Sequence, residues 1–520
     1  VAELTDQVVE VLTRRTDSDT LHIEDIQDQV ELALMRSGEH KVARAYVLYR
    51  EEQKKKRAEE EAQTGVIDEK HIVDVTLADG TKAPLDHIRL TALVNEACKG
   101  LADVDVEKII EDTCRNLFDG VKERDVGTTL VMTARTLIES EPNYSKVAAR
   151  LLLDNMRQEA LGFLDMNTAI ATQEEMADVY GDYFRGYINK AVELELLDPR
   201  LNQYDLEKIT AALDATRDLQ FTYLGLQTLF DRYFIHDEDG TRFELPQAFF
   251  MRVAMGLAIN EIDREERAIE FYTLLSSFDF MSSTPTLFNS GTLRPQLSSC
   301  YLTTVPDHLD GIYGSIKDNA LLSKFAGGLG NDWSRVRGLG SHIKGTNGKS
   351  QGVVPFLKVA NDTAVAVNQG GKRKGAVCAY LETWHIDIED FLELRKNTGD
   401  ERRRTHDMNT ANWIPDLFMK RVAEDGKWTL FSPNEVPDLH DLTGLEFENA
   451  YTEYENKAAN GELKISRTLK ATDLWRKMLG MLFETGHPWV TFKDPCNLRY
   501  TNQHAGMVHS SNLCTEITLH

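Results

Sequence analysis

Three polar side chains near residue 514 have the types and spacing to do chemistry on a small molecule. Asn512, Cys514 and Glu516 place an amide, a thiol and a carboxyl group at alternate positions. In an extended backbone, alternate side chains point to the same side, so the three are expected to share one face. Four residues at about 3.3 Å each give a row roughly 13 Å long, about the reach of a bound nucleotide.

A second cysteine, Cys300, follows the polar pair Ser298-Ser299, and we expect it to share one active site with Cys514. A buried cysteine is usually an inert small hydrophobe, and periodicity alone gives that interpretation for Cys514 too. Burying Asn512 and Glu516 beside the thiol would require partners for both polar groups, which a site built only for packing avoids. The packing interpretation is kept for the other cysteines, which are Cys98, Cys114, Cys378 and Cys496.

Composition excludes several classes of protein. The net charge of −25 argues against general affinity for a nucleic acid polymer, because phosphate backbones attract basic surfaces. No apolar run reaches membrane-spanning length, and the first residues have no signal-peptide pattern. Six cysteines in 520 residues, none in a Cys-x-x-Cys pair, predict neither a disulfide framework nor a zinc site. We therefore expect a cytoplasmic, thiol-reduced protein with no metal on this chain.

Two glycine-rich stretches invite phosphate-binding interpretations. Gly348-Lys349-Ser350 is not a P-loop, because Ile343 stands where that motif needs glycine and Pro355 disfavours a following helix. The spacing of glycines over 327–330 does not fit a dinucleotide fingerprint. Backbone N–H groups in these stretches could still bind phosphate, although plain surface loops are the favoured interpretation. We predict loops over 338–352 and 369–375.

The histidines suggest no clear metal site. His385 and Glu389 share a face at helical spacing, but a solvated helix face is the favoured interpretation. His504 and His509 are left without a role. A thiol-protease interpretation lacks a convincing histidine partner for either cysteine.

The elements that must position these residues change in character along the chain. Helices are predicted over 1–60, a hairpin over 73–85 around Asp79-Gly80, and a weak internal repeat relates two N-terminal helical units. Mainly helical sequence follows over 145–280, and from about 281 short apolar runs alternate with glycine-rich loops and helices, which is typical of an α/β domain. The predicted domains are 1–62, 63–160, 161–280 and 281–520.

From about residue 225 onward, the motifs resemble the large (α) subunit of ribonucleotide reductase, in order along the chain. The sequences of these motifs are similar to those of class I enzymes, which depend on a separate radical-generating subunit. The two N-terminal units resemble ATP-cones. This resemblance implies a ten-stranded α/β barrel, incomplete in this chain. The matching stretches are Thr284-Pro285-Thr286, Ser298-Ser299-Cys300, Gly345-Thr346-Asn347-Gly348, Gln369-Gly370-Gly371, Trp413-Ile414-Pro415-Asp416-Leu417-Phe418-Met419 and Ser511-Asn512-Leu513-Cys514-Thr515-Glu516.

The resemblance also implies a role for each matching residue. Cys514 would become a thiyl radical that takes the 3′-hydrogen of a ribose, Glu516 would be the base for the 3′-hydroxyl, and Asn512 would hydrogen-bond to the substrate. Cys300 would be one of two cysteines that reduce the 2′ position. Other matching positions are those that contact the substrate (Thr284, Ser299), bind a deoxynucleotide effector (Asp307, Lys324, Arg337, Ile343) or carry its signal to the substrate (Gln369, Gly370, Gly371, Lys372, Arg373).

The implied activity is reduction of ribonucleoside diphosphates under nucleotide control. The implied cofactors and partners are dNTP or ATP effectors with Mg²⁺, a small (β) subunit with a dimetal radical cofactor, a second α subunit, and thioredoxin or glutaredoxin. The second reducing cysteine and the radical-transfer tyrosines of relatives lie beyond His520, so we expect no turnover from this polypeptide alone. Since the cones lack the usual basic residues, we also expect weak ATP binding. The rival interpretations are an adenosylcobalamin-dependent reductase and a non-catalytic nucleotide-binding regulatory platform.

Overall fold

The computed structural model describes residues 30, 73–77, 80–169, 172–325, 327–367 and 375–520, which fall in two compact units. The smaller unit contains a hairpin in which β1 (Asp74–Thr76) pairs antiparallel with β2 (Lys82–Pro84). Gly80, in the connecting turn, has a φ of 83°, which glycine adopts readily. The hairpin predicted over 73–85 is confirmed. Apart from residue 30, the helices predicted over 1–60 lie outside the described residues, as do the first repeat unit and the loop residues 369–373.

The larger unit begins with a helical part, as predicted for 145–280. A buried ion pair joins α11 (Pro246–Ala258) to the segment before it: Arg252 Nε lies 2.7 Å from Glu244 Oε1, and Arg252 also donates to the carbonyls of Leu287 and Ser290. The helices are α4 (His87–Cys98), α5 (Val106–Asn116), α6 (Glu123–Thr136), α7 (Tyr144–Phe163), α8 (Gln173–Glu193), α9 (Leu206–Ala211), α10 (Tyr223–Arg232), α11 (Pro246–Ala258), α12 (Arg264–Ser276) and α13 (Thr284–Asn289). Helix α13 thus lies just after residue 281, where the α/β pattern is expected to begin.

The α/β part follows, and its centre is a parallel sheet of five strands in the order β12-β9-β8-β5-β4. The sheet is open rather than closed into a barrel. Its strands are β4 (Cys300–Thr304), β5 (Gly328–Asp332), β8 (Ala376–Glu382), β9 (Asn409–Ile414) and β12 (Trp489–Phe492). Its helices are α14 (Leu309–Ser323), α15 (Val354–Ala366), α16 (Ile388–Leu392), α17 (Asp416–Ala423), α18 (Gly444–Ala459), α19 (Ala471–Thr485) and α20 (Lys493–Arg499).

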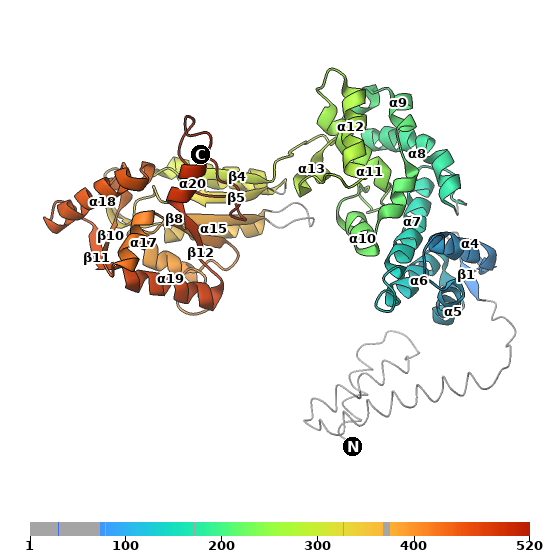
Figure 1. Cartoon of the computed structure of the whole chain (residues 1–520), viewed down its shortest axis with the longest axis horizontal. Coiled ribbons are helices and arrows are strands. Elements are labelled where there is room, and N and C mark those ends of the chain that lie inside the picture. Colours follow the sequence, from blue (N-terminus) through green and yellow to red (C-terminus); the bar gives the residue numbers. More distant parts are fainter. Residues whose placement is uncertain (1–29, 31–72, 78–79, 170–171, 326, 368–374) are drawn as a thin grey trace. The chain divides into compact units, whose positions relative to one another are not determined.

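The two faces of the sheet have different cores. Along β8, Val377, Ala379 and Leu381 belong to the large core that includes α15 and α19. Cys378 and Tyr380 belong to a smaller cluster on the opposite face, together with Val508 and Leu513 from the C-terminal segment. Figure 1 shows α15 and α19 on the other side of the sheet from this segment. The C-terminal segment therefore covers the face that no helix of the large core covers.

Strands lie in two glycine-rich stretches for which loops are predicted, residues 338–352 and 327–330. Residues 338–352 form an antiparallel hairpin of β6 (Leu339–Ile343) and β7 (Gly348–Gln351). Elsewhere, β10 (Lys427–Phe431) pairs antiparallel with β11 (Ser466–Lys470). The glycine-rich residues 328–330 lie in buried strand β5. Glycine content predicted loops because glycine disfavours strands in isolation. At these positions tertiary packing outweighs that preference.

Candidate active site and effector cavity

The centre of the candidate active site is a contact between β4 and the C-terminal segment. Asn512 Nδ2 lies 3.0 Å from Cys300 Sγ, 212 positions away in sequence, and 2.8 Å from Glu516 Oε1. The Cys300 thiol lies 4.0 Å from the same Glu516 oxygen. Ser299 Oγ adds a contact of 3.4 Å to Cys300 Sγ. A thiol, an amide and a carboxylate thus converge on one point, but the thiol is that of Cys300 and not that of Cys514.

The extended row predicted for 512–516 is wrong, because these residues form a turn. Asn512 N–H donates to the Ile517 carbonyl at 3.1 Å, and Ile517 N–H donates back to Asn512 Oδ1 at 3.1 Å. Thr515 has a φ of 72°, which reverses the chain between these two residues. The turn brings Glu516 back against Asn512, which an extended strand with the same spacing would keep well apart.

Cys514 lies at the tip of this turn and is exposed, as are Thr515 and Glu516. A thiol that carries a radical is expected to be buried, and the turn explains the difference because Cys514 lies at its exposed tip. Cys514 is nevertheless close enough to the buried Cys378 to act on it. Burial raises the pKa of Cys378, and Cys514 raises it further. Cys378 therefore stays a neutral thiol below the exposed one.

Glycines in β5 allow the C-terminal segment to approach the sheet closely. A Cβ added to Gly330 would lie 1.8 Å from the Ser511 carbonyl oxygen, and one added to Gly328 would lie 3.4 Å from Leu513 Cβ. The Tyr380 hydroxyl of β8 donates to the Asn512 carbonyl at 2.7 Å. The packing of Ser511 to Leu513 against the strand therefore accounts for the glycines that suggested a phosphate loop.

A separate cavity of about 670 Å³ lies beside the β6–β7 hairpin. Arg337 Nε lies 2.9 Å from Asp307 Oδ2, and Arg337 Nη1 donates to the His342 carbonyl at 3.1 Å. Its size suits a small organic ligand, and its basic side chains suit an anionic one. The lining residues are Asp307, His308, Leu309, Ile312, Val336, Arg337, His342, Ile343, Lys344, Gly345, Thr346, Ser350, Phe356 and Asn434.

Three of the four residues expected to bind an effector line this cavity: Asp307, Arg337 and Ile343. Lys324 follows the last residue of α14, whereas Leu309 and Ile312 of the same helix line the cavity near its first turn. A helix of this length places its ends roughly 22 Å apart, so Lys324 lies outside the cavity. Thr284, at the start of α13, has its hydroxyl 3.1 Å from that of Tyr233, and its contact with a substrate stays a prediction.

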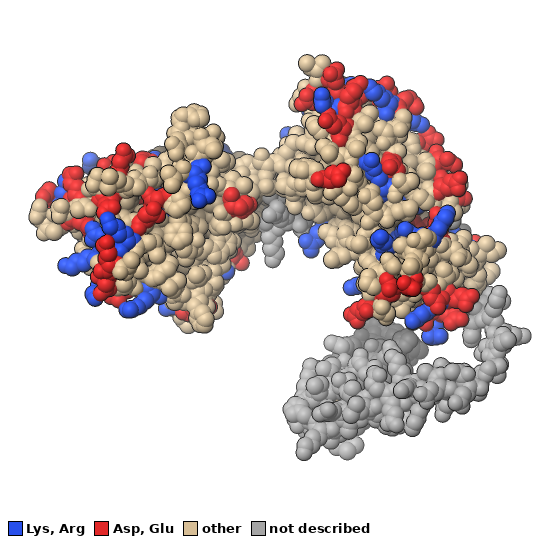
Figure 2. Space-filling view, viewed as in Figure 1, with Lys and Arg blue, Asp and Glu red and all other residues tan. Residues whose placement is uncertain are grey.

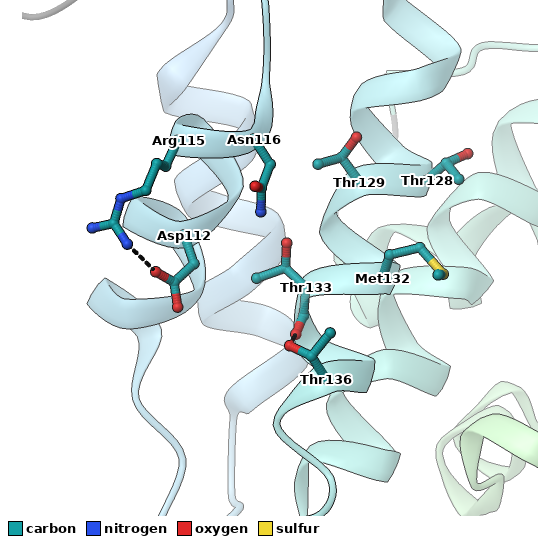
Figure 3. Close-up of a pocket in the computed structure, with 8 residues that line it drawn as sticks. All are labelled: Asp112, Arg115, Asn116, Thr128, Thr129, Met132, Thr133 and Thr136. Atoms are coloured by element: carbon teal, nitrogen blue, oxygen red, sulfur yellow. Dashed lines mark hydrogen bonds and ion pairs between the residues drawn. The ribbon is translucent and has the colours of Figure 1, made fainter. Parts of the chain in front are cut away.

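The second cone-like unit has a shallow pocket between α5 and α6, shown in Figure 3. Arg115 is the one basic side chain among its lining residues, and it is paired with Asp112 at 3.0 Å. The remaining residues are Asn116, Thr128, Thr129, Met132, Thr133 and Thr136. Because phosphate binding favours cationic donors, this pocket is a poor site for a triphosphate.

A charged cluster, here called the histidine cluster, lies where strands β5 and β8 end. His440 Nε2 lies 2.6 Å from Asp332 Oδ2, and His509 Nε2 lies 3.1 Å from Asp441 Oδ1. The two imidazole rings stack with centroids 3.9 Å apart. The other members are the ion pairs Arg335–Asp441 (2.7 Å) and Lys493–Glu382 (3.0 Å). Sequence analysis gave these histidines no role, because their partners are far away in the chain.

Asp332, His440 and His509 have ligand atoms near one another, but their arrangement is that of an ion pair rather than a metal site. The rings are inclined by 20°, so their in-plane nitrogen lone pairs run side by side instead of converging. The 2.6 Å contact between His440 and Asp332 also leaves no space for an ion between them.

The solvated helix face predicted for His385 and Glu389 is wrong for His385, which is buried and precedes α16, whereas Glu389 within α16 is half-buried and lies 3.4 Å from Lys477 Nζ. Asp387 is buried as well. The Asp387 carboxylate accepts hydrogen bonds from Leu339 N–H at 2.9 Å and Val353 N–H at 3.0 Å. His385 Nε2 lies 2.8 Å from the Val336 carbonyl. These side chains fix the ends of the β6–β7 hairpin, so they satisfy backbone groups that would otherwise be buried without partners.

The histidine cluster predicts that stability depends on pH. Burial opposes the charge of His440, but Asp332 outweighs it and raises the pKa of His440 to about 9. Burial and then the charge of His440 lower the pKa of His509 to about 3. Below the ordinary value of 6.5, the unfolded His509 binds a proton that the folded one refuses, so stability falls as pH drops. Above 6.5, the folded His440 keeps a proton that the unfolded one loses, so stability falls as pH rises toward 9.

We therefore expect maximal stability near pH 6.5, with slopes of up to about 1.4 kcal/mol per pH unit on each side. Tryptophan fluorescence during urea unfolding will report on the α/β part, because all six tryptophans lie between residues 333 and 489. His509→Gln should remove the acid slope, and the exposed His504→Gln should leave it unchanged. An unchanged acid slope in His509→Gln would contradict the assignment.

Comparison with known families identifies the class of protein. The barrel-domain model of ribonucleotide reductase matches residues 298–520, its all-alpha-domain model matches 219–295, and the ATP-cone model matches 1–55 and 74–159. A parallel sheet crossed by a cysteine-bearing segment, after an all-helical part, agrees with these matches. The chain belongs to the ribonucleotide reductase large-subunit family.

Individual relatives are more specific. The chain is 52% identical, over its whole length, to the ribonucleoside-diphosphate reductase subunit alpha of Chlamydia muridarum. It is 43% identical over 86% of its length to the subunit of the same name from Helicobacter pylori strain J99, and 38% identical over 85% to the large subunit from Arabidopsis thaliana. It covers 49%, 54% and 53% of these relatives, so the chain spans about half of their length.

Proposed function

We propose that the whole protein reduces ribonucleoside diphosphates to deoxyribonucleotides by thiyl-radical chemistry under nucleotide control. The observation that carries this proposal is the position of Asn512, whose amide lies within hydrogen-bond distance of both Cys300 and Glu516. One thiol and one carboxylate thus lie on the same side of the turn that carries Cys514. The names of the relatives supply the substrate class.

In this proposal each group has one task. The Cys514 sulfur radical removes the 3′-hydrogen of the ribose, and Glu516 accepts the proton of the 3′-hydroxyl. The 2′-hydroxyl leaves as water with a proton from a dithiol, Cys300 and a second cysteine, which also supplies two electrons and the new 2′-hydrogen by closing to a disulfide. The Cys514 thiol then returns its hydrogen to C3′, which restores the sulfur radical. Asn512 orients the Glu516 carboxylate through its 2.8 Å hydrogen bond. General base catalysis by such a carboxylate typically contributes about 10²- to 10⁴-fold in rate.

A sulfur radical must be shielded from water and stray reductants, whereas Cys514 is exposed here. The relatives are about twice as long as this chain, and we propose that in the whole protein further strands and the bound substrate cover the turn. The proposed partners are a radical-generating small subunit, a second large subunit, and thioredoxin or glutaredoxin as reductant. The small subunit would supply the radical from a dimetal cofactor.

The test is reconstitution of the whole protein with its small subunit, a ribonucleoside diphosphate and a dithiol reductant. Deoxyribonucleotide formation that requires the small subunit would support the proposal. Formation that requires adenosylcobalamin instead would favour the cobalamin-dependent rival. Nucleotide binding without any turnover would favour the regulatory platform. Repeated turnover by residues 1–520 alone would contradict the need for further residues.

The cavity beside the β6–β7 hairpin is the proposed effector site, and Arg337 provides a direct test. Removing a charge-assisted hydrogen bond to a phosphate should weaken binding of a deoxynucleoside triphosphate with Mg²⁺ about 10- to 100-fold in Arg337→Ala. Isothermal titration calorimetry will measure the affinity. Lys349→Ala is the matched control, since this exposed lysine on β7 removes the same charge outside the cavity lining. Equal affinities in both variants would count against the assignment.

The described residues include no helix that is both long and apolar enough to cross a membrane. Figure 2 shows acidic side chains distributed among basic ones over the visible surface. Neither observation bears on the chemistry of the proposed site.

A further inference from the structure

The segment that leads into the catalytic turn, residues 508–513, is held at successive points. Val508 N–H donates to Asn497 Oδ1 at 2.8 Å, and Asn497 Nδ2 donates back to the Val508 carbonyl at 2.9 Å. Ser511 packs on Gly330, and the Asn512 carbonyl accepts from Tyr380. His509 lies between these anchors and is the one charged or titratable side chain of the segment. It joins the segment to the histidine cluster.

The contacts of His509 define its protonation state. Its Nε2–H can donate to Asp441 Oδ1 at 3.1 Å, while one face of its ring stacks on His440. Its Nδ1 is buried, and no described residue lies within hydrogen-bond distance of it. A proton on Nδ1 would therefore be a buried donor without an acceptor, next to the charged His440 ring.

The groups that face His509 come from every element packed around it. Three carboxylates and three cations balance one another when His509 is neutral, so a proton on His509 would add an unbalanced charge. The carboxylates are Asp332 of β5, Glu382 of β8 and Asp441; the cations are Arg335, Lys493 of α20 and His440. Burial and the His440 charge act in the same direction and lower the pKa of His509 to about 3.

We propose that His509 is a positioning residue: its contacts with Asp441 and His440 fix the segment that carries the Cys514 turn and presents Asn512 and Glu516 to Cys300. This inference rests on the proposed function for its catalytic meaning, but its structural content stands by itself. Removing the Asp441 contact should release the turn, break the contact between Asn512 and Cys300, and leave the sheet folded. The cluster would then act on the reaction without touching the substrate.

The test compares His509→Phe, which keeps a ring to stack but loses the hydrogen bond, with His509→Gln, whose side-chain amide nitrogen matches Nε2 and can still donate to Asp441. Hydrogen exchange of the 508–517 peptide should be about tenfold faster in His509→Phe, the effect of losing one hydrogen bond to a charged group. Alkylation of Cys300 by iodoacetamide, followed by mass spectrometry, should accelerate in parallel. His509→Gln should restore much of the wild-type rate, and the exposed His504→Gln is the control.

Wild-type exchange and alkylation rates in a folded His509→Phe protein would overturn the inference. If that variant does not fold, Asp441→Ala removes the acceptor of this hydrogen bond at a half-exposed position and should reproduce both accelerations. Neither readout needs substrate or turnover. A failed reconstitution would therefore refute the proposed function and leave this inference standing, whereas unchanged exchange would refute this inference alone.

Discussion

Replacing Cys514 by serine in the whole protein should abolish ribonucleotide reduction and leave effector binding intact. Serine keeps the size and polarity of the side chain, but its O–H bond is too strong for the hydroxyl to serve as the hydrogen-abstracting radical. Because residue 514 is exposed in this chain, the substitution should change the free energy of unfolding by no more than about 0.5 kcal/mol. Product formation, deoxynucleotide affinity and thermal unfolding are the three measurements.

Cys114→Ser is the control, because Cys114 is a half-buried cysteine of α5 without a role in the proposed chemistry. It should retain activity. Turnover by the Cys514→Ser protein at the wild-type rate would contradict the proposed thiyl-radical mechanism. Wild-type protein that binds deoxynucleotides but never turns over with its small subunit would instead support the regulatory platform.

Gly330→Ala should displace the C-terminal segment, because its Cβ would lie 1.8 Å from the Ser511 carbonyl oxygen and 2.8 Å from the Ser511 carbonyl carbon. Both atoms belong to backbone, so rotation of a flexible side chain cannot relieve the overlap. Overpacking of this kind typically destabilises by about 1–3 kcal/mol, and a backbone clash lies at the upper end. Activity should fall with stability, because the displaced segment carries Asn512.

Gly314→Ala is the matched control for that substitution. Gly314 lies within α14, and an added Cβ meets no atom within 4 Å. Alanine there should stabilise the protein by about 0.5–1 kcal/mol, because it reduces the freedom of the unfolded chain. Urea unfolding followed by tryptophan fluorescence will measure both variants. Similar stability of the two would show that Ser511 is not held against β5.

Sequence was most informative where local pattern decides structure. The alternation of residues 73–77 with Asp79-Gly80 predicted a hairpin, and helical periodicity predicted the helical part. Side-chain type alone also indicated the candidate site residues, and the structure brings Cys300, Asn512 and Glu516 together. Their individual catalytic roles stay predictions, as do those of Thr284, Lys324 and the loop residues 369–373.

Sequence was least informative where distant segments decide structure. An alternating amide, thiol and carboxyl fit an extended strand, but the positive φ of Thr515 makes a turn and exposes Cys514. Gly328 and Gly330 suggested a loop, because the segments that require glycine there, Leu513 and Ser511, lie 185 and 181 positions away in the sequence. The histidine cluster depends on pairs such as Asp332 and His440, separated by 108 positions, which no local pattern can predict.

The open sheet has a consequence for how the chain behaves in solution. Its outer strands, β4 and β12, each pair with a single neighbour among the described strands. The other side of each strand presents a row of N–H and C=O groups that can template a further strand. Because such pairing is made by backbone hydrogen bonds rather than by side chains, strands of many different sequences can pair with these edges. At high concentration we therefore expect residues 1–520 to associate edge to edge unless a complementary polypeptide occupies these rims.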